Sequence, residues 1–389
     1  MIDAEQAWQA ICRALSPLDS QTISLDDALG GYLAESIRAD RDIPAADRAA
    51  MDGFAVRAAD LEAIPAKLHV VGEVAASAVP GRGPAQGECI RIFTGANVPP
   101  GADAVVRVED TDLGSFADKT PACEVVIAKQ VPVGANIFRQ GENARRGQEL
   151  LAVGTQLRSA QIAVAAACGY GRIRMYAKPT VAILVTGAEL LAADAGTPRT
   201  CEIRDSNGPM LTAACQAETF GVVLCRQVPD DLETTREAIR QAGESADVVV
   251  LTGGVSAGRY DFVRPAIESL GATVHYHGVA MKPGKPQLFA TLPSGTPLFG
   301  LPGNPLSAAI GWHEFVLPAL RLLAGCPAAG CRPLLPLPLA AAADKTSDLL
   351  QVIPAVIEAD PTGTRVRPRP PVGSADLVTA GTTDGTILL

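Results

Sequence analysis

The sequence predicts a multidomain α/β protein: a doubly wound parallel-sheet domain accompanied by a discontinuous α/β domain, an inserted β domain and a C-terminal β domain. The chain has 389 residues, which is more than one ordinary core organises. From residue 179 to 326, short β-branched runs alternate with segments of helical spacing, as they do in βαβ units. Residues 51–137 and 327–389 instead carry short apolar runs between proline and glycine turns.

Two segments, residues 1–50 and 138–178, flank the β insertion, and we expect them to pack together as one N-terminal domain. Residues 3–16 place apolar side chains at helical spacing, which predicts an amphipathic opening helix. A second helix is expected over residues 159–167, because a glycine stop follows it. Four β-rich runs of the insertion are predicted strands: residues 69–74, 88–93, 104–108 and 123–127.

The central sheet is expected from the region between residues 179 and 326. Strands are predicted at residues 181–186, 221–228, 247–251, 273–278 and 297–300, and helices at 209–220, 231–242, 263–270 and 306–323. Strands that alternate with helices of this length form a parallel sheet with helices on both faces. After residue 326 the composition changes to a linker rich in proline and alanine, and then to β-rich sequence.

The composition narrows the function classes. The formal net charge of -9 argues against a nucleic-acid partner, because phosphate backbones bind to basic faces. No apolar run approaches the roughly 20 residues of a membrane span, and residues 1–6 lack a signal-peptide pattern, so no membrane contact and a cytoplasmic location are expected. His275 and His277 share one face of an expected strand. They are either a paired metal site or, as is more common, two ordinary polar positions.

Four loops follow predicted strands of the central sheet: residues 186–189, 230–231, 252–261 and 302–305. Ligands of open α/β sheets bind outside the carboxyl ends of the strands, where these loops would meet. The loop from Thr252 to Asp261 is rich in glycine, and glycines let backbone N–H groups close around a phosphate without interference from a Cβ. The sequence therefore predicts an anion site at this edge.

Charged side chains accompany these loops. Glu189, Asp230 and Asp261 are carboxylates at three strand ends, which suits Mg²⁺ that keeps several waters and bridges phosphate oxygens. Lys282 and Lys285 lie in a proline-stiffened turn, where two fixed cations would neutralise an oxyanion, the alternative being a solvated surface turn.

Three shorter motifs have two interpretations each. Residues 205–209 precede a helix, either as an anion or ribose contact or as a plain cap. Asp52 before Gly53 is either a carboxylate fixed against a pocket or a turn. Thr94 and Gly95 end a strand where a hydroxyl and a backbone N–H would meet an anion, although such a pair is more often a turn.

Six blocks resemble the signature motifs of the MoeA molybdopterin molybdenumtransferase family, which is similar to the gephyrin E domain. They are AMDGFA at 50–55, FTGA at 93–96, DSNG at 205–208, TGGVSAG at 252–258 with Asp261, MKPGKP at 281–286 and LPGNP at 301–305. The blocks occur in the family's order and span nearly the whole chain. The resemblance implies an elongated four-domain homodimer with a MogA-like domain at 179–326, and a cleft that pairs this domain of one subunit with other domains of its partner.

The implied activity is the Mg²⁺-dependent insertion of molybdate into adenylyl-molybdopterin, with cleavage of the adenylyl group and release of AMP. Implied partners are a MogA-like adenylyltransferase and molybdoenzyme targets. The implied catalytic residues are Asp52, Glu189, Asp230, Asp261, Lys282 and Lys285, and Glu189, Asp230 and Asp261 would also hold the metal. The implied ligand-binding residues are Thr94, Gly95, Ser206, Asn207, Gly253, Gly254, Ser256, Gly258, Pro302, Gly303, Asn304, Pro305 and Ser374.

The chain departs from the family pattern at Asn143, Ala188 and Gly278, and the segment 344–351 lacks an expected arginine pair. Each departure removes charge from the implied cleft. A specialised protein that binds or delivers the cofactor without catalysis is therefore the alternative to the enzyme. A protein with only the activity of a MogA-like adenylyltransferase is disfavoured by the AMDGFA block and by the additional domains.

Overall fold

The computed structural model describes residues 1–116, 123–255, 261–345, 347–361 and 363–389. The chain divides into two units. The first comprises Met1–Glu35, Val153–Ile162 and Arg172–Leu389, and the second comprises Ser36–Ala152 and Ala163–Gly171. Among the described residues, no helix combines the length and the apolar character needed to cross a membrane.

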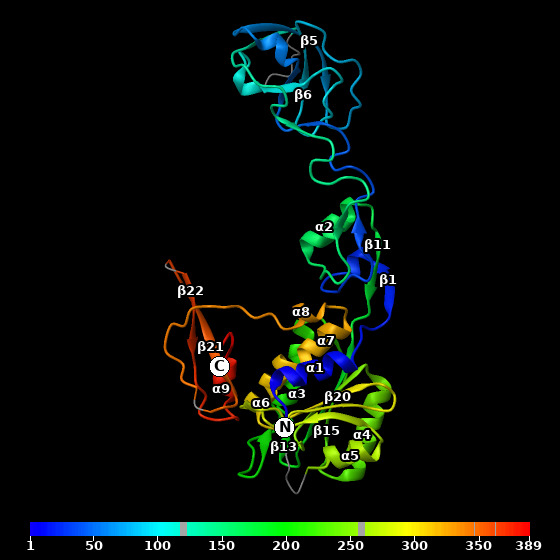
Figure 1. The fold of residues 1–389 in the computed structure, drawn as a ribbon, viewed down its shortest axis with the longest axis vertical. Helices are drawn as coiled ribbons and strands as arrows, with labels where there is room; N and C mark the ends of the chain where they lie inside the picture. Colours follow the sequence, from blue (N-terminus) through cyan, green and yellow to red (C-terminus); the bar gives the residue numbers. More distant parts are fainter. Residues whose placement is uncertain (117–122, 256–260, 346, 362) are drawn as a thin grey trace. The chain divides into compact units, whose positions relative to one another are not determined.

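A six-stranded sheet, in the order β15-β12-β16-β20-β19-β17, forms the centre of the first unit (Figure 1). Four neighbouring strands are parallel, as predicted: β15 (Gly221–Val228), β12 (Thr180–Thr186), β16 (Val248–Thr252) and β20 (Pro297–Leu301). Every residue of β16 and β20 is buried, because helices cover both faces of the sheet.

The other edge of this sheet differs from the prediction of a wholly parallel sheet. β17 (Thr273–His277) and β19 (Leu288–Thr291) run antiparallel to their neighbours, and β19 is a strand that the sequence pattern did not reveal. Only residues 292–296 connect β19 to β20, which is too short for the crossover that parallel strands require. A hairpin is the connection that such a short link allows.

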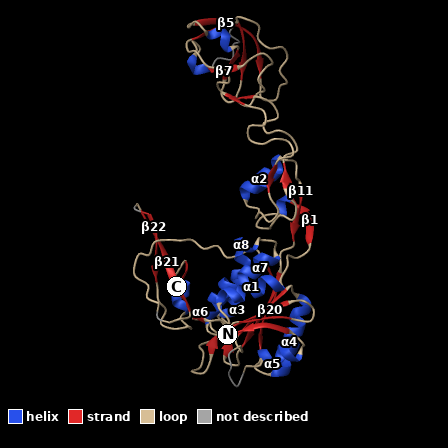
Figure 2. Cartoon of the chain, in the orientation of Figure 1, coloured by secondary structure: helices blue, strands red, loops and turns tan. Residues whose placement is uncertain are grey.

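Alternate residues of the central strands face two separate cores. Ala182, Leu184 and Val249 pack against α4 (Leu232–Ser245) and α5 (Val263–Ser269). On the opposite face, Val181, Ile183 and Val250 pack with the helices of the other layer (Figure 2). These are α1 (Ala4–Ala14), α3 (Asn207–Ala217), α6 (Pro305–Gly311) and α7 (Leu317–Leu323).

One predicted helix of this layer forms as expected, and another differs from the prediction. α1 begins with a capping box between Asp3 and Gln6 and buries Trp8 and Ile11, as its spacing indicated. The single helix expected over residues 306–323 instead contains a π turn, Trp312–Val316, between α6 and α7. Pro318 lacks the N–H that a continuous α-helix would use, and the wider turn lies immediately before the helix that contains it.

A small C-terminal sheet is built around β21 (Leu350–Asp360), which pairs antiparallel with β22 (Gly363–Pro368) and β23 (Gly385–Leu388). β21 also pairs in parallel with β18 (Met281–Lys282), so this sheet contacts the predicted lysine turn directly. The remaining elements of the first unit are β1 (Ser20–Ser24), β11 (Arg172–Tyr176), β13 (Leu190–Leu191), β14 (Ile203–Arg204), α8 (Ala328–Cys331), α9 (Leu377–Gly381) and the short 3₁₀ turn Leu25–Asp27.

The second unit contains a five-stranded sheet in the order β7-β4-β6-β5-β8. Its strands are β4 (Gly53–Val56), β5 (Ala66–Val74), β6 (Glu88–Ile92), β7 (Ala104–Arg107) and β8 (Glu124–Ile127). Four of them lie where the β-rich runs predicted strands, whereas no strand was predicted at β4, which directly follows Asp52. The other elements are β2 (Ile37–Arg38), β3 (Arg48–Ala49), β9 (Ile137–Phe138), β10 (Glu149–Leu151), the 3₁₀ turns Ala58–Leu61 and Val108–Asp110, and α2 (Ser159–Ala167), which extends across both units.

Candidate functional site

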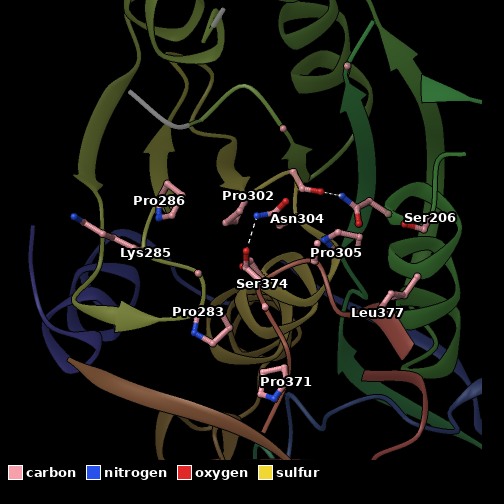
Figure 3. Close-up of a pocket in the computed structure, with 18 of the residues that line it drawn as sticks. Ser206, Pro283, Lys285, Pro286, Pro302, Asn304, Pro305, Pro371, Ser374 and Leu377 are labelled. Carbon is pink, nitrogen blue, oxygen red and sulfur yellow. Dashed lines mark hydrogen bonds between the residues drawn. The ribbon is translucent and has the colours of Figure 1, made fainter. Parts of the chain in front are cut away.

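A cavity of about 1310 Å³ lies at the carboxyl ends of β12, β16 and β20. Loops after these strands form one part of its wall, and residues 370–375 of the C-terminal region form another (Figure 3). Most of the predicted site residues line it: Glu189, Ser206, Asn207, Asp230, Gly253, Gly254, Asp261, Lys282, Lys285, Pro302, Gly303, Asn304, Pro305 and Ser374. The structure thus brings together residues that are far apart in the sequence.

Five predicted residues are not among those lining the cavity. Ser256 and Gly258 lie outside the described residues. Asp52, Thr94 and Gly95 belong to the second unit, where they form a local arrangement of their own.

The glycines after β16 are needed for the close approach of two loops. Gly253 has φ of 88° and Gly254 has φ of 62°, a region that side chains with a Cβ rarely adopt. A Cβ at Gly253 would lie 2.6 Å from the carbonyl oxygen of Thr186. The N–H of Gly253 donates to the carbonyl of Leu301 at 3.1 Å, which ties this loop to the end of β20.

Three predicted metal ligands, Glu189, Asp230 and Asp261, line the same cavity. One oxygen of Asp230 accepts a hydrogen bond of 2.8 Å from the backbone N–H of Ala188. Across the described ranges, no group of three or more His, Cys, Asp or Glu residues is arranged as a ready-made metal cage. This donor set fits Mg²⁺, which binds through one or two carboxylates and substrate phosphates while retaining waters.

The two lysines of the cavity lie in a segment whose backbone pairs with the N-terminal residues on one side and with β21 on the other. The N–H of Ala280 donates to the carbonyl of Ile2 at 2.7 Å, and the carbonyl of Ala280 accepts from Leu350 at 3.0 Å. Both Lys282 and Lys285 are exposed. Backbone pairing to the N-terminal segment and to β21 therefore sets the position of the turn, while the ammonium groups stay accessible to an anion.

Gly278, where the family often has a basic residue, adopts φ of 92° at the start of this segment. Its N–H donates to the carbonyl of Gln287 at 2.7 Å, closing the loop that contains the lysines. A glycine fits this conformation better than a basic side chain would. The departure at this position therefore has a local backbone reason.

The C-terminal region reaches the cavity through Ser374. The side-chain amide of Asn304 donates to the Ser374 hydroxyl at 2.6 Å (Figure 3). The N–H of Ser307 donates to the Ser374 carbonyl at 3.3 Å. Additional lining residues that sequence reasoning missed come from this region, including Gln351, Pro370 and Leu377. The sequence after the linker was predicted only as β-rich, and the partner strand β18 has two residues, which leave no pattern.

The segment before α3 contains the predicted helix-start motif. Ser206 occupies the N-cap position but makes no side-chain capping bond, whereas Asp205 accepts a 2.9 Å hydrogen bond from the N–H of Gly208. The plain cap that was one interpretation is thus supplied by Asp205. Ser206 and Asn207 line the cavity.

In the second unit, Asp52 is held as a fixed carboxylate at the start of β4. One of its oxygens accepts hydrogen bonds of 2.7 Å from both the backbone N–H and the hydroxyl of Thr94. These hydrogen bonds, the backbone one first, hold the pKa of Asp52 below its ordinary value, and the charge of Arg91 lowers the pKa further. Gly95 continues the turn and donates its N–H to the carbonyl of Ala49 at 2.8 Å.

The two histidines that share a strand face have separate partners. The Nε2 atom of His277 lies 2.8 Å from the carbonyl oxygen of Val255, and that of His275 lies 2.8 Å from the Thr291 hydroxyl. Each ring therefore has a structural partner, and the ordinary polar interpretation accounts for both. Through its contact with Val255, His277 meets the glycine loop just after β16.

Family models match most of the chain. Residues 2–169 match the MoeA N-terminal region (domain I and II), and residues 182–322 match the probable molybdopterin binding domain. The molybdopterin molybdenumtransferase of Bacillus subtilis (strain 168) is 34% identical over 325 residues, which cover 82% of this chain and 74% of the relative. That of Staphylococcus epidermidis strain ATCC 12228 is 35% identical over 331 residues, covering 84% and 77% respectively.

Solved structures agree with these matches and with the predicted multidomain α/β fold class. The molybdopterin biosynthesis moeA protein from Pyrococcus horikoshii OT3 is similar with a TM-score of 0.82 and 26% identity, covering 100% of this chain and 95% of that chain. A molybdenum cofactor biosynthesis protein from Pyrococcus furiosus, 17% identical with a TM-score of 0.58, shares the fold. The chain therefore belongs to the MoeA family of molybdopterin molybdenumtransferases, a family of transferases in molybdenum cofactor biosynthesis.

Proposed function

We propose that this protein inserts molybdate into adenylylated molybdopterin and releases AMP in a step that depends on Mg²⁺. The observation that carries the proposal is the cavity at the carboxyl ends of β12, β16 and β20, which collects carboxylates, lysines and glycine loops from distant parts of the chain. Both substrates are anionic, so the lysines and the backbone N–H groups would bind them, and the carboxylates would bind the cation.

Each group has a role that its chemistry supports. Lys282 and Lys285 would neutralise molybdate or phosphate oxygens, and the loop with Gly253 and Gly254 would hold the pterin phosphate. Glu189, Asp230 and Asp261 would supply oxygen ligands to Mg²⁺, whose Lewis acidity polarises a phosphoryl oxygen. The other predicted residues that line the cavity, Ser206, Asn207, Ser374 and those at 302–305, would shape the ligand surface.

The proposed assembly is a homodimer with four domains in each chain, namely residues 1–50 with 138–178, 51–137, 179–326 and 327–389. Asp52 and Thr94 would complete the cleft of the partner subunit, as the family resemblance implies. The fixed, ionised carboxylate of Asp52 supports a role of this kind. A cytoplasmic location, a MogA-like adenylyltransferase as the source of the substrate, and molybdoenzymes as recipients belong to the same proposal.

The test is to mix the purified protein with adenylyl-molybdopterin, molybdate and Mg²⁺ and to follow the release of AMP. We expect release by the wild-type protein and a decrease of at least about 100-fold for Asp261→Asn, because the isosteric amide removes the charge that would attract the cation. The matched control is Asp26→Asn, an exposed carboxylate outside the cavity, which is expected to retain wild-type activity.

A different outcome would favour the second candidate function. If the wild-type protein binds adenylyl-molybdopterin but releases no AMP, and Asp261→Asn binds it equally well, the protein holds or delivers the cofactor without catalysis. The observation that favours this alternative is the loss of charge at Asn143 and Ala188 relative to the family pattern.

A further inference from the structure

Asn207 joins three segments of the cavity wall. It is the first residue of α3, and its side-chain amide donates hydrogen bonds to two acceptors in other loops. One acceptor is the hydroxyl of Thr252 at the end of β16, at 2.8 Å, and the other is the carbonyl of Gly303 after β20, at 2.9 Å. These partners lie 45 and 96 residues away in the sequence.

A second hydrogen bond links Thr252 to the loop that contains Gly303. The Thr252 hydroxyl donates its one hydrogen to the carbonyl of Pro302 at 3.1 Å, while it accepts from Asn207. Thr252 has 1% of its surface exposed and Asn207 has 6%, so solvent does not replace either bond. The chain of donors therefore runs in one direction, from Asn207 through Thr252 to Pro302.

This direction fixes the orientation of the Asn207 amide. A flipped amide would place its oxygen against the Gly303 carbonyl and against the Thr252 oxygen, whose hydrogen is already donated to Pro302. The observed orientation satisfies all of these acceptors. In it, the Oδ1 atom of Asn207 is buried and has no hydrogen-bond partner among the described residues.

Leaving a buried acceptor without a partner is unfavourable, and native structures retain few such groups. Here the two bonds donated by the amide nitrogen hold the Asn207 side chain in place, and the amide oxygen accepts no hydrogen bond from the residues that the structure describes. Those bonds hold the loop with Gly253 to the loop with Gly303, which already approach closely enough that a Cβ at Gly303 would lie 3.5 Å from Gly253.

We propose that Asn207 and Thr252 form a hydrogen-bond clamp that positions the loop 253–255 and residues 303–307 at the start of α6 for ligand binding, with Asn207 as a positioning residue. This inference rests on the proposed function only for the identity of the ligand. We expect the clamp to act mainly on substrate binding, because the loop with Gly253 and Gly254 would hold the pterin phosphate. Loosening it therefore raises KM and leaves kcat nearly unchanged.

The test compares Asn207→Ala, Thr252→Val and Thr252→Ser. Valine has the shape of threonine without its hydroxyl, and serine retains the hydroxyl. Hydrogen–deuterium exchange of backbone amides at residues 253–255 and at the non-proline residues of 303–307 is expected to accelerate about tenfold in Asn207→Ala and Thr252→Val, as loss of a buried hydrogen bond allows. Thr252→Ser is expected to exchange at the wild-type rate, and amides of α4 are expected to be unaffected in all three.

The kinetic measurement uses adenylyl-molybdopterin as the varied substrate. KM is expected to rise about tenfold in Thr252→Val, with kcat within about threefold of wild type. Thr252→Ser, which retains the hydroxyl, is expected to have the wild-type KM. Unchanged loop exchange in both Asn207→Ala and Thr252→Val would overturn the clamp, and so would equal acceleration in α4. Should the wild-type protein release no AMP, the proposed function fails, while the exchange experiment still decides whether the clamp exists.

Discussion

At the scale of single residues, Asp52 illustrates how two hydrogen bonds keep a carboxylate charged. The N–H and the hydroxyl of Thr94 both donate to the same oxygen of Asp52, and they favour the ionised form. The pKa of Asp52 is therefore depressed. This interaction stabilises the folded protein above the unfolded-state pKa, and its contribution is lost as the pH falls through the folded-state value.

Replacing Thr94 tests this assignment. Thr94→Val removes the hydroxyl but keeps the backbone donor, so the pKa of Asp52 is expected to rise toward the ordinary value of about 3.9. Carboxyl-carbon NMR titration of the two proteins measures the change. Thr94→Ser retains the donor and is expected to titrate like wild type; an identical midpoint in Thr94→Val would show that the hydroxyl does not set the pKa.

The two cavity lysines give a second prediction at this scale. Lys282→Ala and Lys285→Ala each remove one exposed cation from the wall, and each is expected to raise KM for adenylyl-molybdopterin about tenfold. The dependence of KM on ionic strength should weaken at the same time, because fewer charges attract the substrate. Lys129→Ala, an exposed lysine of the second unit, serves as the control for general charge loss.

Which residues carry charge and where the glycine loops follow strands could be predicted from the sequence, since both depend on local patterns. Their hydrogen-bond partners could not. The pairs Asn207–Thr252 and Asn304–Ser374 depend on side-chain directions of residues brought together only by the fold. No periodicity within one segment contains that information.

At the scale of elements, β4 is a strand that the alternation of polar and apolar residues does not reveal. All four of its residues, Gly53–Val56, are buried, so no alternation of polar and apolar residues marks them as a strand. The strand pairs with β6 on one side and β7 on the other. It thereby places Asp52, the residue just before it, at the end of the sheet.

Gly53 makes this pairing sterically feasible. A Cβ at Gly53 would overlap the backbone carbonyl oxygen of Val106 on β7, and a backbone atom cannot move aside as a flexible side chain can. Gly53→Ala is therefore expected to destabilise the protein by about 3 kcal/mol in denaturant unfolding. Gly72→Ala on β5, where a Cβ meets nothing within 4 Å, is the matched control. Equal stability of the two variants would contradict the assigned role of the contact.

Strand order in the central sheet was predictable only in part. β12, β16 and β20 are apolar runs separated by helical segments, and that alternation predicts parallel pairing. The antiparallel edge depends on the hairpin between β19 and β20, and a run of four residues is too short to distinguish from loop. The two-residue β18 is defined by backbone pairing alone.

At the scale of the whole molecule, the proposed homodimer makes a prediction about shared sites. If Asp52 of one subunit completes the cleft that contains Asp261 of its partner, Asp52→Asn and Asp261→Asn inactivate different halves of each site. Mixing and exchanging subunits of the two inactive proteins would then restore about a quarter of wild-type activity, since half of the dimers are mixed and each mixed dimer has one intact site. If the mixture recovers no activity, either both residues belong to the site of one subunit or the protein is not dimeric.

The stoichiometry of a single reaction tests whether the protein transfers molybdenum to molybdopterin. Wild-type protein is incubated with adenylyl-molybdopterin, molybdate and Mg²⁺, and molybdenum bound to molybdopterin is quantified beside the AMP released. A transferase is predicted to yield about one molybdenum per AMP, with both products strongly reduced in Asp261→Asn. Precursor that binds without yielding either product would show that the protein does not catalyse this transfer.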